Sequence, residues 1–570
     1  MKILFSAMHF AYFRNFESVI RGLAERGHRV HLAADEPESF GGQALAERLT
    51  AEYPAVSWSY APQPAAEPSF VFARRVRHAL DYVRFLDPRY ADVPKLRLRN
   101  VERAPRIVRW LTSGVGGGLG GHRLVGRLLR WIERSMPPSA AARTFLETQS
   151  PDAVVLTSLT FSRSSAIEQL KSARAFGIPV AAGIMSWDHL SSKALLHIAP
   201  DLTLVWNDVQ KREATEMHAL PADRVVVTGA QCYDQWFDRR PSRSREEFCR
   251  RAGLDPKRSF VLYVCSAMSP VPDPIEPRFV KEWVLALRSS DDPVLRDAGV
   301  LVRPHPERVK EWAGISLDGL DNVVVHGATP IDRDSKADYF DALVFSRAVV
   351  GLCTSAFLEA AIVGRPVLTL MLPPYRMHQD GMAHFRYLLN VEGGLLHTAP
   401  DLAAHLRQLA EALSAPETRE ERNRQFLTAF IRPGGLDTPA TPAFVEAIER
   451  LAATPRRSER EATPAVAATA WVRWLATAAA TRPGQWLMMD GVDIARAESE
   501  RQRGQVKEQI LDARAAYHDH KAMARDEQRR ASEQRRRAKS WTKWRRGLSA
   551  RKQVARLKGG LKQLTGARHQ

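Results

Sequence analysis

The stretch MKILFSAMHFAYFRNFESVIRGLAERGHRVHLAAD, Met1–Asp35, decides the fold class. Residues 2–7 form a short apolar run that is typical of a buried strand. Apolar residues then recur at helical spacing over 16–23, and Gly27 ends that helix. Residues 28–35 are a second strand. Strand, helix and strand in this order predict a parallel sheet with helices on its faces.

The same alternation of strand and helix recurs along most of the chain. It predicts an N-terminal α/β domain over 1–240 and a second α/β domain over 241–450. Arginine-rich amphipathic helices predict a helical insertion in the first domain at about 70–138. We expect 451–570 to be a linker and a basic helical or disordered tail, because the end of the chain has few aliphatic residues.

The composition excludes several classes of protein. Of the 570 residues, 45% are hydrophobic and 26% are charged, which is ordinary for a folded soluble protein. The four cysteines have neither the pairing of a disulfide framework nor the spacing of a zinc site, and reduced thiols fit a cytoplasmic protein. No run of about 20 apolar residues occurs, so we expect no membrane span.

The net charge of +19 belongs mainly to the end of the chain. Residues 501–570 carry 21 Lys and Arg against 6 Asp and Glu, whereas the preceding 500 residues carry 62 against 58. This basic segment also holds Trp541 and Trp544, a mixture that suits an anionic membrane surface. It could also bind nucleic acid or an acidic polysaccharide, or remain a solvated tail.

A phosphate site is predicted where the strand in GVLVRPHP ends. Arg303 and His305 lie on one face of this strand, and Pro304 and Pro306 remove donors from the ladder and end it. Ligands of open parallel sheets bind beyond the carboxyl ends of strands, where Arg and His can donate to phosphate oxygens. The alternative is a structural pair of Arg303 with a carboxylate, and a capped His305.

A second phosphate contact is predicted in AVVGLCTSAFLEAAIVGRPVLTL. A buried strand is followed by Thr354 and Ser355, which are good residues to begin a helix. Amides at a helix N-terminus bind phosphate, and the two hydroxyls add donors. Glu359 lies one turn into this otherwise apolar helix, and a buried carboxylate needs a partner. That partner is either a pair of ribose hydroxyls or a nearby cation such as Arg365.

Candidate catalytic residues follow strands of the first domain. Asp188 is placed to take a proton from an acceptor hydroxyl, or else it caps the helix that begins near Leu190. His9, just past the first strand, is the rival base, or else a structural histidine. Three polar residues after the last clear strand of the second domain could line a cleft, although loop polarity explains them equally well: His378, Gln379 and Asp380.

No metal site or cofactor is predicted. The acidic pair in 332–334 precedes a helix and is better explained as capping. Basic groups can offset the charge of a leaving group without a divalent ion. The nucleotide-activated donor would therefore be a substrate, with no cofactor beside it.

The RPHP and TSAFLEAAIVGRPV motifs resemble the nucleotide-binding domain of GT-B glycosyltransferases. The HP pair followed by a Thr-Ser pair is similar to bacterial polysialyltransferases and CDP-glycerol glycerophosphotransferases. The resemblance extends loosely over 1–450 and is specific over about 303–371. It implies a GT-B-like α/β fold, in which two Rossmann-like domains face a cleft.

The resemblance also implies roles for individual residues. Arg303 and His305 would contact the donor phosphate, as would Thr354 and Ser355 from the helix end, while Glu359 would hold the ribose. Another phosphate contact is implied after the strand in FVLYVCSAMSP, at two serines: Ser266 and Ser269. The first loop lacks the glycines common in GT-B enzymes, and the TSAFLE turn lacks the Gly pair of UDP-sugar epimerases. The donor nucleotide therefore stays open.

The expected function is a glycosyltransferase of surface polysaccharide biosynthesis. It would move a sugar from a nucleotide-activated donor to a glycan or lipid-linked acceptor. Alternatives are a CDP-glycerol-type polyol-phosphate transferase, a nucleotide-sugar epimerase, or a non-catalytic protein with a nucleic-acid-binding tail. A lipid-linked acceptor favours an anionic membrane surface, and no specific nucleic acid, as the partner of 501–570. The protein would then be cytoplasmic and peripheral at the inner face of the membrane.

Overall fold

The fold is described from a computed structural model of the chain. It describes residues 1–491 apart from 39–40, 64–66, 92, 114–120, 268–274, 329, 331, 415–419 and 456–465, together with Asp493 and Lys552. The chain divides into two compact units, Met1–Gly491 and Val492–Gln570. Ser269 and nearly all of the basic segment 501–570 lie outside the described residues, so the predictions made for them stay predictions.

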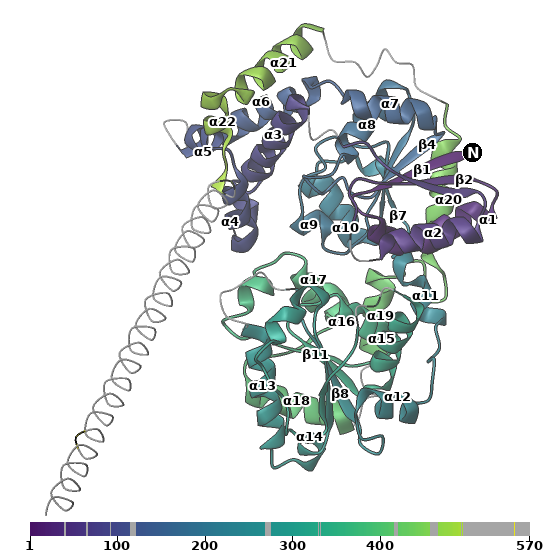
Figure 1. Ribbon diagram of the computed structural model, residues 1–570, viewed down its shortest axis with the longest axis vertical. Helices are drawn as coiled ribbons and strands as arrows, with labels where there is room; N and C mark the ends of the chain where they lie inside the picture. The colour runs from purple at the N-terminus through teal and green to yellow at the C-terminus, as the bar shows by residue number, and fades with distance from the viewer. Residues whose placement is uncertain are drawn as a thin grey trace, which may run out of the picture. The chain divides into compact units, whose positions relative to one another are not determined.

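The first lobe is built on a seven-stranded parallel sheet (Figure 1). Its strands are β1 (Lys2–Ala7), β2 (Arg29–Ala34), β3 (Val56–Tyr60), β4 (Ala153–Leu156), β5 (Val180–Gly183), β6 (Leu202–Val205) and β7 (Val225–Val227), in the spatial order β3-β2-β1-β4-β5-β6-β7. The predicted opening is confirmed, because β1, helix α1 (Glu17–Glu25) and β2 form a strand-helix-strand unit in which Ile3 is in register with Val30.

The second lobe is built on a six-stranded parallel sheet. Its strands are β8 (Phe260–Val264), β9 (Gly299–Arg303), β10 (Val323–Val325), β11 (Ala348–Gly351), β12 (Val367–Leu370) and β13 (His397–Ala399), in the order β10-β9-β8-β11-β12-β13. The predicted fold class, an α/β protein with two Rossmann-like parallel sheets, is confirmed by these two topologies.

Helices cover both faces of each sheet, because successive side chains of a buried parallel strand point to opposite faces. In the first lobe, α1, α2 (Gly42–Glu52) and α20 (Ala440–Ala452) pack on the face that carries Phe5, and α7 (Ala140–Gln149) and α8 (Ala166–Ala175) pack on the face that carries Leu4. In the second lobe, α13 (Ile275–Arg288), α14 (Pro293–Arg296) and α18 (Leu402–Ser414) cover one face, and α12 (Arg245–Ala252), α15 (Arg333–Phe345), α16 (Ala356–Ile362) and α19 (Glu420–Phe430) cover the other.

The shorter helices lie mostly at the ends of strands. In the first lobe these are η1 (Phe10–Asn15), α9 (His189–Ser192), α10 (Asp208–Arg212), the π-helix η4 (Glu213–Met217), η5 (Ala222–Arg224), η6 (Gln231–Tyr233) and α11 (Asp234–Asp238). In the second lobe they are η7 (Pro306–Trp312), η8 (Arg376–His378), α17 (Phe385–Asn390) and η9 (Val391–Gly393).

The chain crosses between the lobes twice, and one carboxylate holds both crossings. After β7 the chain reaches Asp234 at the start of α11, and after α19 it returns through Arg432 to α20 on the first lobe. The Arg432 guanidinium pairs with Asp234 Oδ1 at 3.0 Å, and the Thr441 amide donates to Oδ2 at 2.7 Å. Helix α20 therefore packs on the first sheet, although the sequence placed it within the second domain, because its apolar face completes the core around Phe16 and Phe444.

The insertion is helical, as the sequence indicated, and it has a hydrophobic core of its own. Its helices are α3 (Pro68–Arg84), η3 (Pro88–Tyr90), α4 (Pro94–Arg103), α5 (Arg106–Ser113) and α6 (Gly121–Ser135). Two later helices, α21 (Val466–Ala480) and α22 (Arg482–Met488), pack on it, and Val472 and Ala476 enter its core. The sequence assigned these two helices to the C-terminal tail. Across the described residues, no helix is both long and apolar enough to span a bilayer.

Strand order identifies where ligands should bind. In the first sheet the order reverses between β1 and β4, and in the second it reverses between β8 and β11. Neighbouring helices leave in opposite directions at such a reversal, which opens a crevice at the carboxyl ends of the two strands. Each lobe therefore contributes one such crevice.

Candidate functional site

A cavity of about 310 Å³ lies at the reversal points of both sheets. The first lobe contributes Arg14 and Asn15, which follow β1, and Met185 and Ser186, which follow β5. The cavity is therefore shared by the two lobes, at the carboxyl ends of their strands, which is where the topology predicts a ligand.

The second lobe brings the two predicted phosphate motifs to this same cavity. The end of β9 contributes 303–306, the turn before α16 contributes Thr354 and Ser355, and Cys265 lies between them at the end of β8. Strands β9 and β11 both flank β8, so their carboxyl ends meet at one edge of the sheet. The prediction that these motifs share a crevice is confirmed, whereas the role of each residue in it stays a prediction.

Arg303 is held by a carboxylate. Its Nη1 donates to Asp338 Oδ2 at 2.9 Å and its Nη2 to the Ala328 carbonyl at 2.9 Å. Burial raises the pKa of Asp338, but hydrogen bonds from His326 and Arg303 outweigh burial and hold that pKa at about 2. Arg303 therefore forms the structural ion pair that was the alternative to phosphate binding. It still lines the cavity.

His305 is held in one orientation at the cavity wall. Its Nδ1 accepts a hydrogen bond from the Glu307 amide at 3.3 Å, which fixes the start of η7. Burial lowers the pKa of His305 below its usual value, so the imidazole is neutral at neutral pH. Because Nδ1 accepts, the ring proton of the neutral form lies on Nε2. This nitrogen can donate to an anionic oxygen.

The start of α16 presents two hydroxyls to the cavity. The Thr354 Oγ1 accepts from the Ala356 amide at 3.3 Å, and it can still donate its own proton. Ser355 occupies the cap position without a side-chain bond to the helix, and it is exposed. Both side chains are therefore free to donate to a ligand, because a hydroxyl that accepts still has a proton to give.

Glu359 faces the cavity and accepts a hydrogen bond from the Tyr339 hydroxyl. Burial raises the pKa of Glu359 to about 7, although the Tyr339 bond and the Arg14 charge oppose this rise. Arg365, its possible partner from the sequence, instead donates to the carbonyls of Val363 at 3.2 Å and Ser346 at 3.3 Å. Glu359 is thus bonded to the Tyr339 phenol and not to Arg365.

Several cavity residues were missed by the sequence analysis. Arg14, Arg239 and Lys336 line the cavity together with Arg303, while Glu359 is the one carboxylic acid among the described residues that line it. Burial lowers the pKa of both Arg239 and Lys336. This excess of positive charge favours an anionic ligand. Only Arg14 carried a signal in the sequence, since it lies in the loop after the first strand.

An aromatic wall completes the cavity. Tyr233, Trp236 and Tyr339 line it, and the ring of Trp236 meets that of Tyr339 edge to face at 5.8 Å. Flat, apolar rings of this kind pack well against a nucleobase. The wall could not be predicted from the sequence, because Tyr233 and Trp236 lie about a hundred positions before Tyr339.

Ser266 serves a structural purpose. It is buried, its hydroxyl donates to Glu276 Oε1 at 3.1 Å, and the Cys353 amide donates to that hydroxyl at 2.9 Å. Ser266 therefore ties the end of β8 to the turn after β11. It is absent from the described lining of the cavity, so its predicted contact with phosphate finds no support in this arrangement.

Asp188 lies beside the cavity, next to Ser186. Its carboxylate accepts from the Ser186 hydroxyl at 2.6 Å and from the Ser192 hydroxyl at 2.8 Å, and it makes no side-chain bond to the helix backbone. Burial raises the pKa of Asp188, but the charges of His189, Lys193 and His384 outweigh burial and leave that pKa well below its usual value. The carboxylate is therefore ionised, and its lowered pKa makes it a weaker base than an ordinary aspartate.

His9, the rival base, lies at the start of η1. Its ring meets Tyr12 edge to face at 5.4 Å, and its Nδ1 is buried with no hydrogen-bond partner among the described residues. It is not among the described residues that line the 310 Å³ cavity.

The three residues expected in a cleft near η8 separate in the structure. Gln379 is fully buried, and its amide donates to the carbonyls of Leu352 at 3.0 Å and Leu370 at 2.8 Å, so it braces the ends of two strands. Asp380 forms an ion pair with Arg376. His378 contacts no hydrogen-bonding partner among the described residues, and burial lowers its pKa to about 4. Gln379 is therefore not a cleft residue, because the strand ends need its donors.

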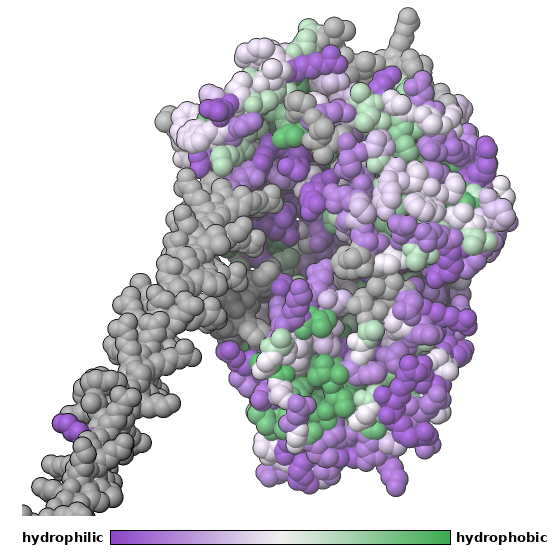
Figure 2. Space-filling model, viewed as in Figure 1, coloured by the Kyte–Doolittle hydropathy of each residue, from purple (hydrophilic) through white to green (hydrophobic). Residues whose placement is uncertain are grey.

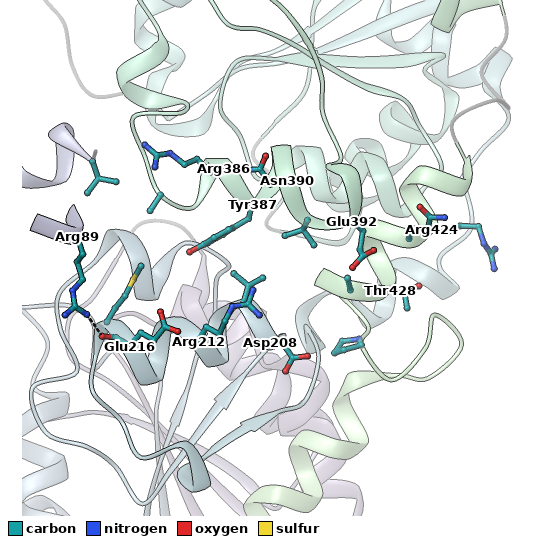
Figure 3. Close-up of a pocket in the computed structure, with 18 of the residues that line it drawn as sticks. Arg89, Asp208, Arg212, Glu216, Arg386, Tyr387, Asn390, Glu392, Arg424 and Thr428 are labelled. Carbon is teal, nitrogen blue, oxygen red and sulfur yellow. Dashed lines mark hydrogen bonds between the residues drawn. The ribbon is translucent and has the colours of Figure 1, made fainter. Parts of the chain in front are cut away.

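A larger cavity of about 1330 Å³ also lies between the lobes (Figure 3). Arg89, Arg212, Arg386 and Arg424 line it, but so do four acids: Asp208, Glu216, Glu392 and Glu421. The charges are balanced, and none of the predicted site residues lies there. The smaller cavity, with its excess of cations at both reversal points, is the better candidate for an anionic ligand.

Comparisons with known proteins found matches among solved structures alone. No protein-family model matches the chain, and no curated protein matches it. Among solved structures, WaaG, a glycosyltransferase involved in lipopolysaccharide biosynthesis, is 12% identical with a TM-score of 0.42, over 79% of this chain and 100% of its own. A glycosyltransferase from Rickettsia africae is 11% identical with a TM-score of 0.46, over 80% and 99%. UDP-GlcNAc 2-epimerase from Neisseria meningitidis is 13% identical with a TM-score of 0.45, over 79% and 100%.

Proposed function

We propose that the chain is a glycosyltransferase that moves a sugar from a nucleotide-activated donor to a glycan or lipid-linked acceptor of surface polysaccharide biosynthesis. The observation that carries the proposal is the meeting of the β9 end and the α16 start in one cation-rich cavity. Arg, His and hydroxyl donors suit the phosphates of a nucleotide. The nearby rings of Tyr233 and Trp236 suit its base.

Residues from several walls of the cavity have roles in the proposed site. His305 Nε2 and the Thr354 and Ser355 hydroxyls donate to the phosphates, and Arg14 and Lys336 offset the charge that develops on the leaving group. Glu359 accepts from the ribose hydroxyls. The proposal includes no divalent metal, and we expect the transfer to survive a chelator.

The acceptor is proposed to approach from the first lobe, where the ionised Asp188 takes the proton of the attacking hydroxyl. Trp187 and His384 lie beside Asp188, with their rings 4.9 Å apart, and come from different lobes. A closing movement would therefore bring groups of both lobes to the acceptor.

A nucleotide-sugar epimerase is the second candidate from the fold. An epimerase needs acids and bases on the sugar itself and no acceptor. Glu359 is the one carboxylic acid among the described residues of the cavity, and it accepts from Tyr339. This shortage of acids favours glycosyl transfer over epimerisation. Conversion of a free nucleotide sugar with no acceptor present would decide for the epimerase.

Calorimetry with a panel of nucleoside diphosphates tests the proposal. We expect one nucleotide to bind, and the Thr354→Val variant to weaken that binding about tenfold because one hydrogen bond to a charged group is lost. Thr148→Val, an exposed threonine on α7 whose hydroxyl caps its own helix, is the matched control and should bind normally. Equal affinity of the parent, Thr354→Val and His305→Ala would refute the site.

A further inference from the structure

Four helices, α5, α6, α21 and α22, form a surface layer on the insertion, which we call the helical layer. They contact one another in sequence-distant pairs, α21 with α6 and α22 with α5, and Figure 1 shows them together with α3. The described residues of α3 and α6 bury their shared face in the insertion's core. The opposite side of the layer is solvent-exposed.

The exposed side of the helical layer is unusually apolar. Trp110 is 71% exposed, Trp474 is 64% exposed and Leu124 is 68% exposed. The large apolar side chains exposed on the layer are Trp110, Leu111, Leu124, Leu128, Trp131, Trp471, Trp474, Trp486 and Leu487. Soluble proteins seldom expose so many large apolar side chains in one place unless another surface binds there.

Helix α6 shows how the apolar and charged residues are arranged. Leu124, Leu128 and Trp131 recur at intervals of four and three, so they form one exposed stripe. The arginines of the helix, at 123, 127, 130 and 134, form a second stripe directly beside it. A third stripe, which includes Leu129 and Ile132, is buried in the core. The helix therefore has one face for the core and a mixed apolar and cationic face for something else.

The apolar stripes continue from helix to helix. The rings of Trp131 on α6 and Trp471 on α21 lie 5.3 Å apart, and Trp474 shares the exposed face of α21 with Trp471. On the other pair of helices, the Arg106 guanidinium lies over the Trp486 ring at 5.0 Å. Figure 2 shows pale and green side chains interleaved with purple ones over this region.

The charge of the layer is almost entirely positive. Its helices carry eight arginines: Arg106, Arg109, Arg123, Arg127, Arg130, Arg134, Arg473 and Arg482. Its single acid, Glu133, is buried and already paired with Arg77 at 2.9 Å and Lys171 at 2.9 Å. Burial and the like charges of Arg134 and Arg127 lower the pKa of Arg130. The layer therefore presents positive charge with no exposed acid on its helices to offset it.

We propose that the helical layer docks on the surface of an anionic lipid membrane. Amphipathic helices that lie in a membrane interface bury Trp and Leu at the level of the headgroups and hold Lys and Arg against anionic lipid. The alternation of Trp, Leu and Arg on one side of α6 and α21 has this arrangement. The eight arginines complement lipid phosphates, and no described acid of the layer would repel them.

This surface is distinct from the basic segment 501–570, for which the sequence alone already favoured a membrane. The helical layer is folded, and its arginines are set by helical spacing. Attachment through it would hold the insertion, and with it the first lobe, at a defined face of the bilayer. The inference does not depend on the reaction proposed above.

Flotation of the full chain with vesicles tests this inference. Vesicles of equal parts phosphatidylcholine and phosphatidylglycerol should carry the protein upward, whereas phosphatidylcholine alone should carry much less. The variant Leu124→Gln, Leu128→Gln, Trp474→Gln should bind about tenfold more weakly, because the apolar contact is lost. The variant Arg127→Gln, Arg130→Gln should also bind more weakly, since each arginine at an anionic surface strengthens binding about fivefold.

Matched substitutions elsewhere control for general effects. Leu285 and Val294, 46% and 39% exposed in the second lobe, are changed to Gln in one control, and Arg250 and Arg251 in another. Circular dichroism and the melting temperature confirm that every variant folds. Loss of flotation in the layer variants alone supports the inference.

Two results would overturn it. If the layer variants float as well as the parent, the attachment belongs to other parts of the chain, since 501–570 is intact in every variant. If instead the parent is a dimer by light scattering, the layer variants are monomers, and flotation is unchanged, the layer covers a second copy of the chain.

Discussion

Replacing Glu359 by Gln isolates the one carboxylic acid among the described residues that line the cavity. Glutamine keeps the shape of the side chain and an oxygen that can accept from the Tyr339 hydroxyl, but it cannot ionise. Burial raises the pKa of Glu359 from 4.5 to about 7 in the folded protein. Between these two values the folded chain holds a proton that the unfolded chain has released.

The sign and size of the effect follow from linkage. The unfolded state binds fewer protons over this range, so the parent loses stability as the pH rises from the unfolded to the folded pKa. Each pKa unit is worth about 1.4 kcal/mol. The ionised carboxylate thus costs the parent up to about 3 kcal/mol above a pH of about 7, a cost that the Gln variant avoids.

Urea unfolding at two pH values measures this difference. We expect the Gln variant to exceed the parent by about 2 to 3 kcal/mol at a pH of about 8, and by less than about 1 kcal/mol at a pH of about 5. Glu246→Gln, at an exposed acid of α12 that pairs with Arg250, is the control and should shift neither curve by more than about 0.5 kcal/mol. A difference between parent and Gln variant that is the same at both pH values would refute a raised pKa at Glu359.

Three further changes test contacts that hold the fold and the site. Arg77→Ala should destabilise the protein by about 3 to 5 kcal/mol in urea unfolding, because Glu133 and a second carboxylate would be left buried without their cation; a loss below about 1 kcal/mol would contradict this. Gln379→Leu should cost about 1 to 3 kcal/mol, since two buried carbonyls lose their donor, and an unchanged melting temperature would count against it. Gly327→Ala should weaken nucleotide binding, because the added Cβ would clash with the Arg303 guanidinium and the residue has a φ of +115°; calorimetry with unaltered affinity would show that Arg303 does not matter there.

The frame of the site could be predicted from local patterns. The prolines after Arg303 and His305 end β9, and the Thr-Ser pair begins α16, so each motif fixes its own position at a strand end. In a parallel sheet such ends lie at one edge, which brings the motifs together with no further information. Glu359 was likewise found from its register on an apolar helix.

The partners of these residues could not be predicted, because they come from distant parts of the chain. Asp338, which holds Arg303, lies on α15, and Tyr339 beside it donates to Glu359. Two adjacent positions of one helix are thus each bonded to a different site residue, and nothing local in the sequence marks either of them. Gln379 was misplaced for a similar reason, since a polar loop residue and a buried brace have the same local sequence.

The domain boundaries show the same limit. Helices α20 and α21 have apolar faces whose targets, the first sheet and the insertion, precede them by hundreds of residues. Periodicity indicates that a helix needs a partner, but it does not say which one. Neither helix packs only on the segment that is nearest to it in the sequence.

The double crossing at Asp234 constrains how the two lobes can move. Both connections pass one carboxylate, which holds Arg432 of the returning chain and the first turn of α20. Two lobes that are connected at one place can rotate about that hinge, but one lobe cannot slide past the other. We therefore expect the cavity walls that carry Arg14 and His305 to approach and separate by rotation about this hinge. The same residues would then face one another at every angle of opening.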